Sequence, residues 1–221
     1  MSELRPLAMG DQIAHRLRVE IIRGIIPPDT HLAEDNLAAR FDVSRGPVRD
    51  ALRQLEVEGL AQDRRKRLYA RAMDIRDVEE LYVVREALES LAIRLAIQNA
   101  SARDWDRVQT IVDEMAVAAA EDAGERFAEL DMDFHTSFYV NSHNRRLLEA
   151  WRPYQRIFAI LFELSDTSDI ASATADHQGF LDVIRTGDVD AAVHRLRLHL
   201  TLAKGHVRDV LRGLSSSRVE A

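Results

Sequence analysis

The sequence predicts a mainly α-helical protein in which a small N-terminal domain with one short hairpin precedes a larger all-helical bundle. Apolar residues recur every three or four positions through most of the chain, which is the spacing of one helix face. Strand-like character is confined to a short basic stretch at 60–71. A chain of 221 residues fits a small domain joined to a larger one. We therefore place the domains at 1–72 and 73–214, followed by a flexible tail at 215–221.

Composition and charge indicate where the protein is located and whether it can bind DNA. The chain has no cysteine, no run of eighteen apolar residues and no signal-peptide pattern, so we expect a cytoplasmic protein without membrane spans. The net charge is −7, but residues 1–70 contain 12 Lys and Arg against 11 Asp and Glu, whereas residues 71–221 contain 18 against 26. Because salt screens charges beyond about 8–10 Å, a local basic face can still bind DNA.

The N-terminal elements form a predicted helix-turn-helix with a wing. Two helices are expected at 11–23 and 31–41, and a short turn then leads to Ser44, a good N-cap residue. The third helix starts there and ends at Gly59. The basic stretch 60–71 is predicted to form a small hairpin, or wing.

Basic side chains gather on the third helix and on the wing. Arg45, Arg49 and Arg53 recur at steps of four on the helix face opposite its apolar stripe, where arginine can contact guanine or phosphate in the major groove. The wing cluster can follow the DNA backbone or enter the minor groove. A solvated basic face is the alternative. The predicted DNA-binding residues are Ser44, Arg45, Arg49, Arg53, Arg64, Arg65, Lys66 and Arg67.

The second domain is predicted to be a bundle of six helices, the fourth of which contains Pro153 and is expected to kink. Its candidate site is a set of oxygen and nitrogen donors. Asp131 and His135 are four residues apart, so they project from one helix face. His177 and His199 fall in two later helices that can converge on the same ion. The expected helices are 75–98, 103–120, 124–141, 145–164, 169–186 and 188–212.

A site of one carboxylate and three imidazoles suits a divalent metal, with Zn²⁺ our first choice and Ni²⁺ or Mn²⁺ as alternatives. For any single histidine, a surface position or an ordinary hydrogen bond is the competing interpretation. We place three further histidines of this region outside the site: His143, His194 and His206.

Longer motifs carry a resemblance to a known family. The segment Leu37–Leu60, LAARFDVSRGPVRDALRQLEVEGL, resembles the winged-helix signature of GntR-type bacterial transcription regulators. Three further features are similar to the FCD effector domain of the FadR subfamily, in its shorter VanR-like branch. They are the segment Val84–Glu89, the pattern Asp-x-x-Phe-His with Asn144 downstream, and the two later histidines. The chain departs from the family at Asp29 and at the wing tip, where glycine usually supplies a positive φ.

The resemblance implies a ligand-responsive regulator, with repression as the default, that reads a near-palindromic operator as a homodimer. It also implies that Asp131, His135, His177 and His199 bind the metal within an effector site for a small carboxylate. Arg85 is expected to pair with that carboxylate, the alternative being an i,i+4 ion pair with Glu89 on a solvated face. Asn144 is expected either to contact the effector or to cap the following helix. Six aromatic residues are assigned to the core, with the wall of the effector pocket as the alternative: Phe134, Phe138, Trp151, Tyr154, Phe158 and Phe162.

Two other function classes compete with this interpretation. A metal with open positions in a helical bundle can belong to a hydrolase or oxygenase, but the sequence contains neither a nucleophile motif nor a pair of Glu-x-x-His elements, so we do not expect an enzyme. A pure metal sensor, in which the ion itself is the signal, is the third interpretation.

Overall fold

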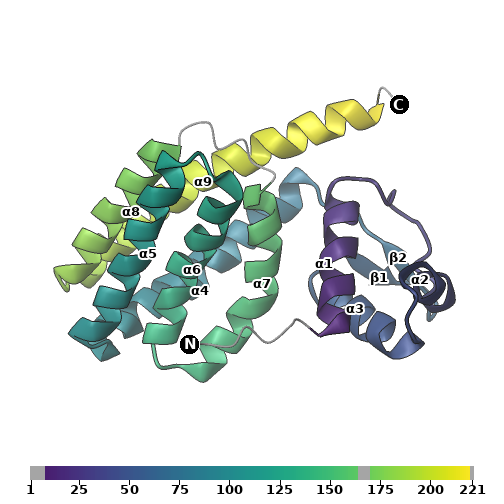
Figure 1. The fold of residues 1–221 in the computed structure, drawn as a ribbon, viewed down its shortest axis with the longest axis horizontal. Helices are drawn as coiled ribbons and strands as arrows, with labels where there is room; N and C mark the ends of the chain where they lie inside the picture. Colours follow the sequence, from purple (N-terminus) through teal and green to yellow (C-terminus); the bar gives the residue numbers. More distant parts are fainter. Residues whose placement is uncertain (1–7, 164–169, 220–221) are drawn as a thin grey trace. The chain divides into compact units, whose positions relative to one another are not determined.

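The computed structural model describes the backbone of residues 8–163 and 170–219 (Figure 1). Contacts divide the chain into two units, one formed by Met1–Asp74 with Leu214–Ala221 and the other by Ile75–Gly213. The chain is mainly helical, with a single two-stranded sheet in the described part, which confirms the predicted fold class. None of the described helices is long and apolar enough to cross a membrane.

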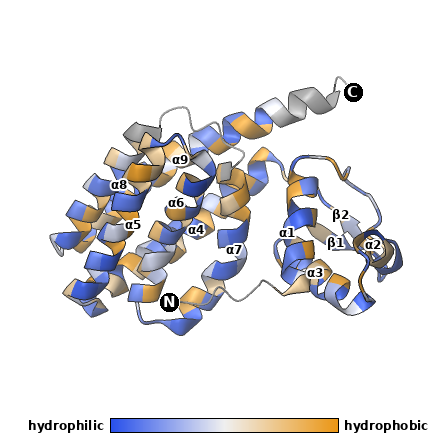
Figure 2. Cartoon of the chain, viewed as in Figure 1, coloured by the Kyte–Doolittle hydropathy of each residue, from blue (hydrophilic) through white to orange (hydrophobic). Residues whose placement is uncertain are grey.

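The N-terminal unit is a winged helix-turn-helix. Helix α1 packs against α3, and both helices combine hydrophobic and hydrophilic residues (Figure 2). Leu17, Leu52 and Leu55 are almost completely buried between them. A buried ion pair between Arg18 and Glu58 adds two hydrogen bonds of 2.7 Å to this core. The elements are α1 (Met9–Ile22), α2 (Glu34–Phe41), α3 (Arg45–Val57), β1 (Ala61–Asp63) and β2 (Leu68–Ala70).

Helix α2 is shorter than predicted, because it begins at Glu34 and not at residue 31. The preceding residues are extended and run beside β2. His31 forms an isolated bridge with Tyr69, and the amide of Leu32 donates to the carbonyl of Leu68 at 2.9 Å. Leu32 is buried as the periodicity suggested, but it is buried from an extended segment.

The wing is a tight antiparallel hairpin in which Ala61 pairs with Ala70 and Asp63 with Leu68. Arg64 and Arg67 exchange backbone hydrogen bonds of 2.8 and 3.3 Å, so the turn has two central residues. These two residues, Arg65 and Lys66, have φ angles of 55° and 66°. Such a turn favours glycine at its second central position. Lys66 therefore occupies the position where the family usually has glycine, and its backbone is strained there.

We expect Lys66→Gly to raise the free energy of unfolding of the N-terminal unit by about 1 kcal/mol, because glycine adopts a positive φ without a Cβ clash. The amide of Lys66 would keep its hydrogen bond to Asp63. Urea denaturation measures the change, and Lys66→Ala is the control that removes the charge but retains Cβ. Equal stability of the two variants would show that backbone strain is not the cause.

The second unit is the predicted six-helix bundle. Helix α6 lies at its centre and packs against α4, α5 and α7 (Figure 1). Helix α7 continues through Pro153 as one helix. The last helix is longer than expected, since it has helical backbone as far as Val219, and residues 220–221 of the predicted tail lie outside the described residues. The elements are α4 (Ile75–Asn99), α5 (Ala102–Ala120), α6 (Gly124–Asn141), α7 (Arg145–Glu163), α8 (Ile170–Arg185) and α9 (Val189–Val219).

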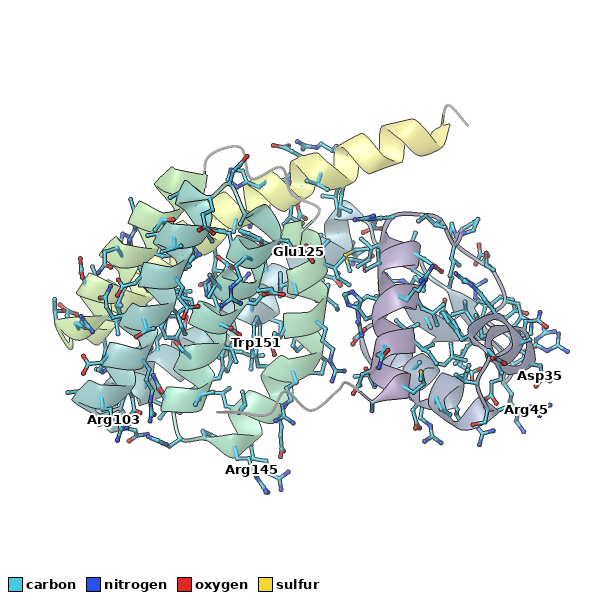
Figure 3. The ribbon with its side chains drawn as sticks, in the orientation of Figure 1. Asp35, Arg45, Arg103, Glu125, Arg145 and Trp151 are labelled. Atoms are coloured by element: carbon cyan, nitrogen blue, oxygen red, sulfur yellow. The ribbon has the colours of Figure 1, made fainter. Side chains whose placement is uncertain are left out.

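Aromatic side chains fill the centre of the bundle. Phe134, Phe138, Trp151 and Phe158 are at most 2% exposed, which agrees with their assignment to the core. The other two of the six predicted core aromatics, Tyr154 and Phe162, are only partly buried. Trp151, labelled in Figure 3, donates to Thr136 at 3.0 Å.

Candidate metal centre and nucleic-acid interface

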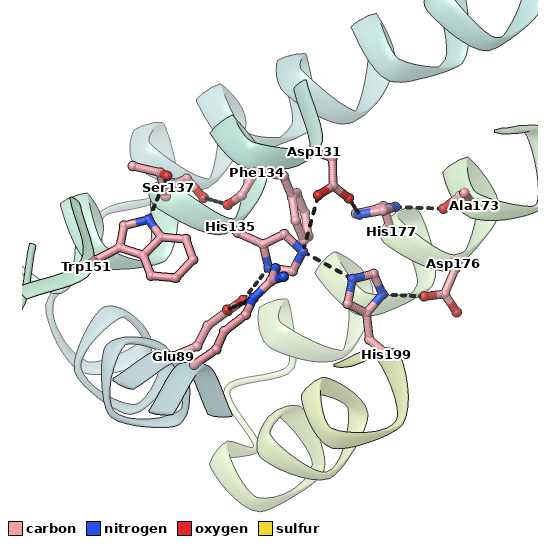
Figure 4. A network of polar contacts seen from close by, with 12 residues as sticks. Glu89, Asp131, Phe134, His135, Ser137, Trp151, Ala173, Asp176, His177 and His199 are labelled. Carbon is pink, nitrogen blue, oxygen red and sulfur yellow. Dashed lines mark hydrogen bonds and ion pairs between the residues drawn. The ribbon is translucent and has the colours of Figure 1, made fainter. Parts of the chain in front are cut away.

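Four buried side chains converge inside the bundle from three helices (Figure 4). Asp131 and His135 project from α6 one turn apart, His177 from α8 and His199 from α9. Each offers one ligand atom, and these atoms all lie within 4.8 Å of one another. Nε2 of His135 is 3.1 Å from Nε2 of His199, and Nε2 of His177 is 2.8 Å from Oδ1 of Asp131.

Each imidazole is held from behind through Nδ1. Nδ1 of His135 contacts Glu89, Nδ1 of His177 donates to the carbonyl of Ala173 at 2.7 Å, and Nδ1 of His199 donates to Asp176 at 2.7 Å. The ionised carboxylates of Glu89 and Asp176 and the carbonyl of Ala173 can only accept hydrogen bonds. In each neutral ring the proton therefore lies on Nδ1. The lone pairs of all three Nε2 atoms therefore face one another, as in metal sites with oriented histidines.

The donor set fits a divalent cation. Two Nε2 lone pairs at 3.1 Å repel each other unless a proton or a cation lies between them. Nε2 of His177 is buried and forms no hydrogen bond with the described residues, despite its short distance to Asp131. An ion bound by three imidazoles and one carboxylate would satisfy every one of these atoms.

The electrostatics also suit a cation. Burial alone would raise the pKa of Asp131, but the neighbouring imidazoles hold the pKa of this carboxyl well below its usual range, so it is ionised. Burial lowers the pKa of His199 to about 4, which keeps this ring neutral at neutral pH. Burial opposes protonation of His177, but the ion pair with Asp131 raises the pKa of this ring overall.

Arg85 is buried beside the cluster and does not lie on a solvated face. Nε of Arg85 donates to Glu89 at 3.1 Å, so the i,i+4 ion pair exists, but both side chains are at most 3% exposed. The guanidinium lies over the ring of Phe158, with Cζ 4.6 Å from the ring centre. Nη2 of Arg85 is buried and has no hydrogen-bond partner among the described residues.

Asn144 has the capping role. Its Oδ1 accepts a hydrogen bond of 3.2 Å from the amide of Leu147 in the first turn of α7. We therefore leave Asn144 out of the effector site. The three histidines that the sequence placed outside the cluster are all exposed: His143, His194 and His206.

The sequence pattern missed two residues of the site, Glu89 and Asp176. Glu89 is completely buried and joins Arg85 to His135. Asp176 accepts from His199 and from Nη2 of Arg195. Glu89 follows Arg85 by four residues, so its helix face could be predicted, but its contact with α6 depends on packing.

In the N-terminal unit, the recognition-helix arginines are exposed but each has an acidic neighbour. Nε of Arg45 lies 2.5 Å from Asp35, and Nη2 of Arg49 lies 3.1 Å from Glu34. The Arg45 and Asp35 pair is labelled in Figure 3. Arg53 is 70% exposed and lies 3.9 Å from Asp50, its neighbour on α3.

Ser44 occupies the N-cap position of α3 and is exposed, but its side chain forms no capping hydrogen bond. The four basic residues of the wing are also exposed. Arg64 pairs with Asp29 at 2.6 Å, and Asp29 itself has a φ of 64° where the family usually has glycine. The surface thus presents cations that DNA phosphates can reach, although several already contact carboxylates.

Comparisons with known proteins match each part of the chain to a family. Residues 9–67 match the family model "Bacterial regulatory proteins, gntR family", and residues 80–202 match the FCD domain model. The chain is 29% identical over 196 residues to the "Probable D-xylose utilization operon transcriptional repressor" of Paenarthrobacter nicotinovorans, covering 87% of this chain and 85% of the relative. It is 26% identical over 209 residues to the gluconate operon transcriptional repressor of Bacillus licheniformis, and the match covers 91% of this chain and 86% of the relative.

Among solved structures, E. coli McbR/YncC shares the fold. Its TM-score is 0.69 at 19% sequence identity, and the match covers 92% of this chain and 99% of that chain.

Proposed function

The chain belongs to the GntR family of bacterial regulatory proteins and carries an FCD domain, and we propose that it is a repressor controlled by a small carboxylate effector. In this proposal a divalent metal in the FCD domain forms part of the effector site. The observation that carries it is the buried cluster whose three Nε2 atoms and one carboxylate converge while every Nδ1 is held from outside.

We propose that Asp131, His135, His177 and His199 are the metal ligands, with Zn²⁺ as the first choice and Ni²⁺ or Mn²⁺ as alternatives. An ion that takes more than four ligands would keep a position beside these residues for an effector oxygen. When bound, the metal supplies positive charge and open positions for an effector oxygen. Glu89 and Asp176 position the rings of His135 and His199.

Arg85 is proposed to bind the effector carboxylate. Its Nη2 is a buried charged donor without a partner among the described residues, and leaving such a donor unsatisfied is costly. A carboxylate supplies the acceptor and the opposite charge. The relative named as a gluconate operon repressor supports the same ligand class, since gluconate is a carboxylate.

On the DNA side, we propose that α3 enters the major groove and that Ser44, Arg45, Arg49 and Arg53 contact bases or phosphates. The exposed wing residues Arg64, Arg65, Lys66 and Arg67 would contact the backbone nearby. Two copies of α3 are needed to read both halves of a near-palindromic operator, so the proposal includes a homodimer.

We propose that the second copy packs against α4 and α9. These helices lie side by side, since Arg197 pairs with Glu86 at 2.8 Å. They expose four large apolar residues, a feature that is typical of association surfaces. These residues are Val83, Leu91, Leu198 and Leu202.

We expect Leu202→Glu to shift the protein from dimer to monomer, because a charge buried without a partner in an interface is strongly unfavourable. Leu202 is 60% exposed in the single chain, so folding of the chain itself should not change. Sedimentation measures the mass. Val117→Glu on α5, at a residue 56% exposed, is the control and should remain dimeric. A dimeric Leu202→Glu variant would place the interface elsewhere.

Operator release tests the regulatory proposal. Duplexes selected from random DNA by the protein itself provide the operator, and fluorescence anisotropy measures binding. We expect gluconate or a related carboxylate to weaken binding only when metal is present, so that EDTA abolishes the response. Release by metal alone would instead identify a metal sensor, and persistence of the response in EDTA would contradict the metal-assisted site.

A further inference from the structure

Two buried donors beside the metal cluster have no hydrogen-bond partner among the described residues. They are Nη2 of Arg85 and the hydroxyl of Tyr139, whose side chains are 3% and 1% exposed. Buried polar groups in folded proteins nearly always have a partner. Two unpartnered donors in one region therefore indicate a place where a bound molecule supplies the acceptors.

Trp151 connects these two donors. Tyr139 lies on α6 one turn beyond His135, and its ring stacks on Trp151 at 4.8 Å with an angle of 6° between the planes. Cζ of Arg85 lies 5.7 Å from the centre of the same tryptophan ring. Arg85 from α4 and Tyr139 from α6 thus contact the same tryptophan in the bundle core.

Burial, assisted by the charge of Glu89, keeps the Tyr139 hydroxyl protonated, so that it can donate a hydrogen bond. Burial raises the pKa of Tyr139, Glu89 raises this pKa further and Arg85 only partly opposes it. The phenol is therefore protonated at neutral pH. Glu89 is already engaged, since one of its oxygens contacts His135 and the other accepts from Nε of Arg85. The Tyr139 hydroxyl forms no hydrogen bond with Glu89 or with any other described residue, so a bound molecule can supply its acceptor.

We propose that Tyr139 contacts the effector and selects acids that carry a hydroxyl group near the carboxylate. This inference rests on the proposed carboxylate site. Nη2 of Arg85 binds a carboxylate oxygen, and the Tyr139 hydroxyl binds the oxygen of the ligand hydroxyl. A simple alkanoate leaves Tyr139 unpartnered, and a site built to bond a hydroxyl discriminates strongly against an analogue that lacks one.

The test compares matched acids by calorimetric titration of the full-length protein loaded with Zn²⁺. The pairs are glycolate and acetate, lactate and propionate, and gluconate and hexanoate. We expect wild type to bind at least one hydroxy acid about tenfold or more tightly than its partner acid. Tyr139→Phe should remove this preference while binding of the partner acid stays the same. Tyr154→Phe, at a half-buried tyrosine of α7, is the control and should behave as wild type.

A second measurement separates ligand contact from a structural role. Tyr139→Phe keeps the ring on Trp151 and removes an unpartnered hydroxyl, so the ligand-free variant should melt at the same temperature as wild type or higher. A clear fall in melting temperature would show that the hydroxyl has a structural partner and would overturn the inference.

The titration also distinguishes the two levels of the proposal. Binding of carboxylates without any preference for a hydroxyl, or a preference that survives in Tyr139→Phe, overturns the role of Tyr139 and leaves the carboxylate site standing. Failure of every acid to bind overturns the carboxylate site, and the inference with it.

Discussion

Replacing His177 with alanine is expected to abolish metal binding while the ligand-free protein still binds DNA. The imidazole supplies one of four ligands, and its Nε2 lies 2.8 Å from Asp131 at the centre of the cluster. Loss of a residue that only orients a ligand typically weakens metal affinity by about 10–100-fold, so loss of the ligand itself should cost more. The N-terminal unit has its own core and does not depend on this ligand.

Thermal melting with and without Zn²⁺ measures this effect. A ligand that binds only the folded state stabilises it by about 4 kcal/mol when its concentration is 1,000 times Kd. Wild type should show this shift and His177→Ala should not. His177→Gln is a second variant that retains more of the buried volume, and His194→Ala removes an exposed histidine as a control. An undiminished Zn²⁺ shift in both His177 variants would exclude this residue as a ligand.

Arg49→Ala is expected to weaken operator binding by about 1–3 kcal/mol, the usual value of a good arginine contact to a base. The loss of operator affinity should be larger still, because Arg49 neutralises Glu34 at the same surface. Without the arginine, the Glu34 carboxylate would face the DNA phosphates unpaired. Metal content should not change.

Anisotropy titrations at several salt concentrations measure the decrease in affinity. If Arg49 binds a base, its removal relaxes sequence specificity, whereas if it binds a phosphate, its removal weakens binding to all sequences and lowers the salt dependence. Arg76→Ala in α4 is the matched control, because it removes an exposed arginine that pairs with an acid four residues away. Equal operator affinity for Arg49→Ala and wild type would remove α3 from the recognition role.

The sequence predicted those features that depend on local periodicity. The four-residue spacing of Asp131 and His135 places both on one face of α6, whatever surrounds that helix. Convergence with His177 and His199 could be suggested only because three helices with apolar stripes must pack together. The family resemblance made that suggestion specific, and the structure brings the four side chains together.

Features that depend on packing could not be predicted. Nothing in the local sequence shows that Glu89 contacts His135 across two helices. The periodicity around Leu32 suggested a helix, but pairing with β2 holds that segment extended. Arg85 and Glu89 have the spacing of a surface ion pair, and only the aromatic cluster around them reveals that the pair is buried.

The metal content of the purified full-length protein tests the central claim most directly. Elemental analysis after extensive dialysis, and again after reconstitution with Zn²⁺, should find about one divalent metal per chain in wild type and almost none in His177→Ala. Absence of metal from wild type, even after reconstitution, would contradict a metal-assisted effector site. The four side chains would then be a buried polar cluster without an ion.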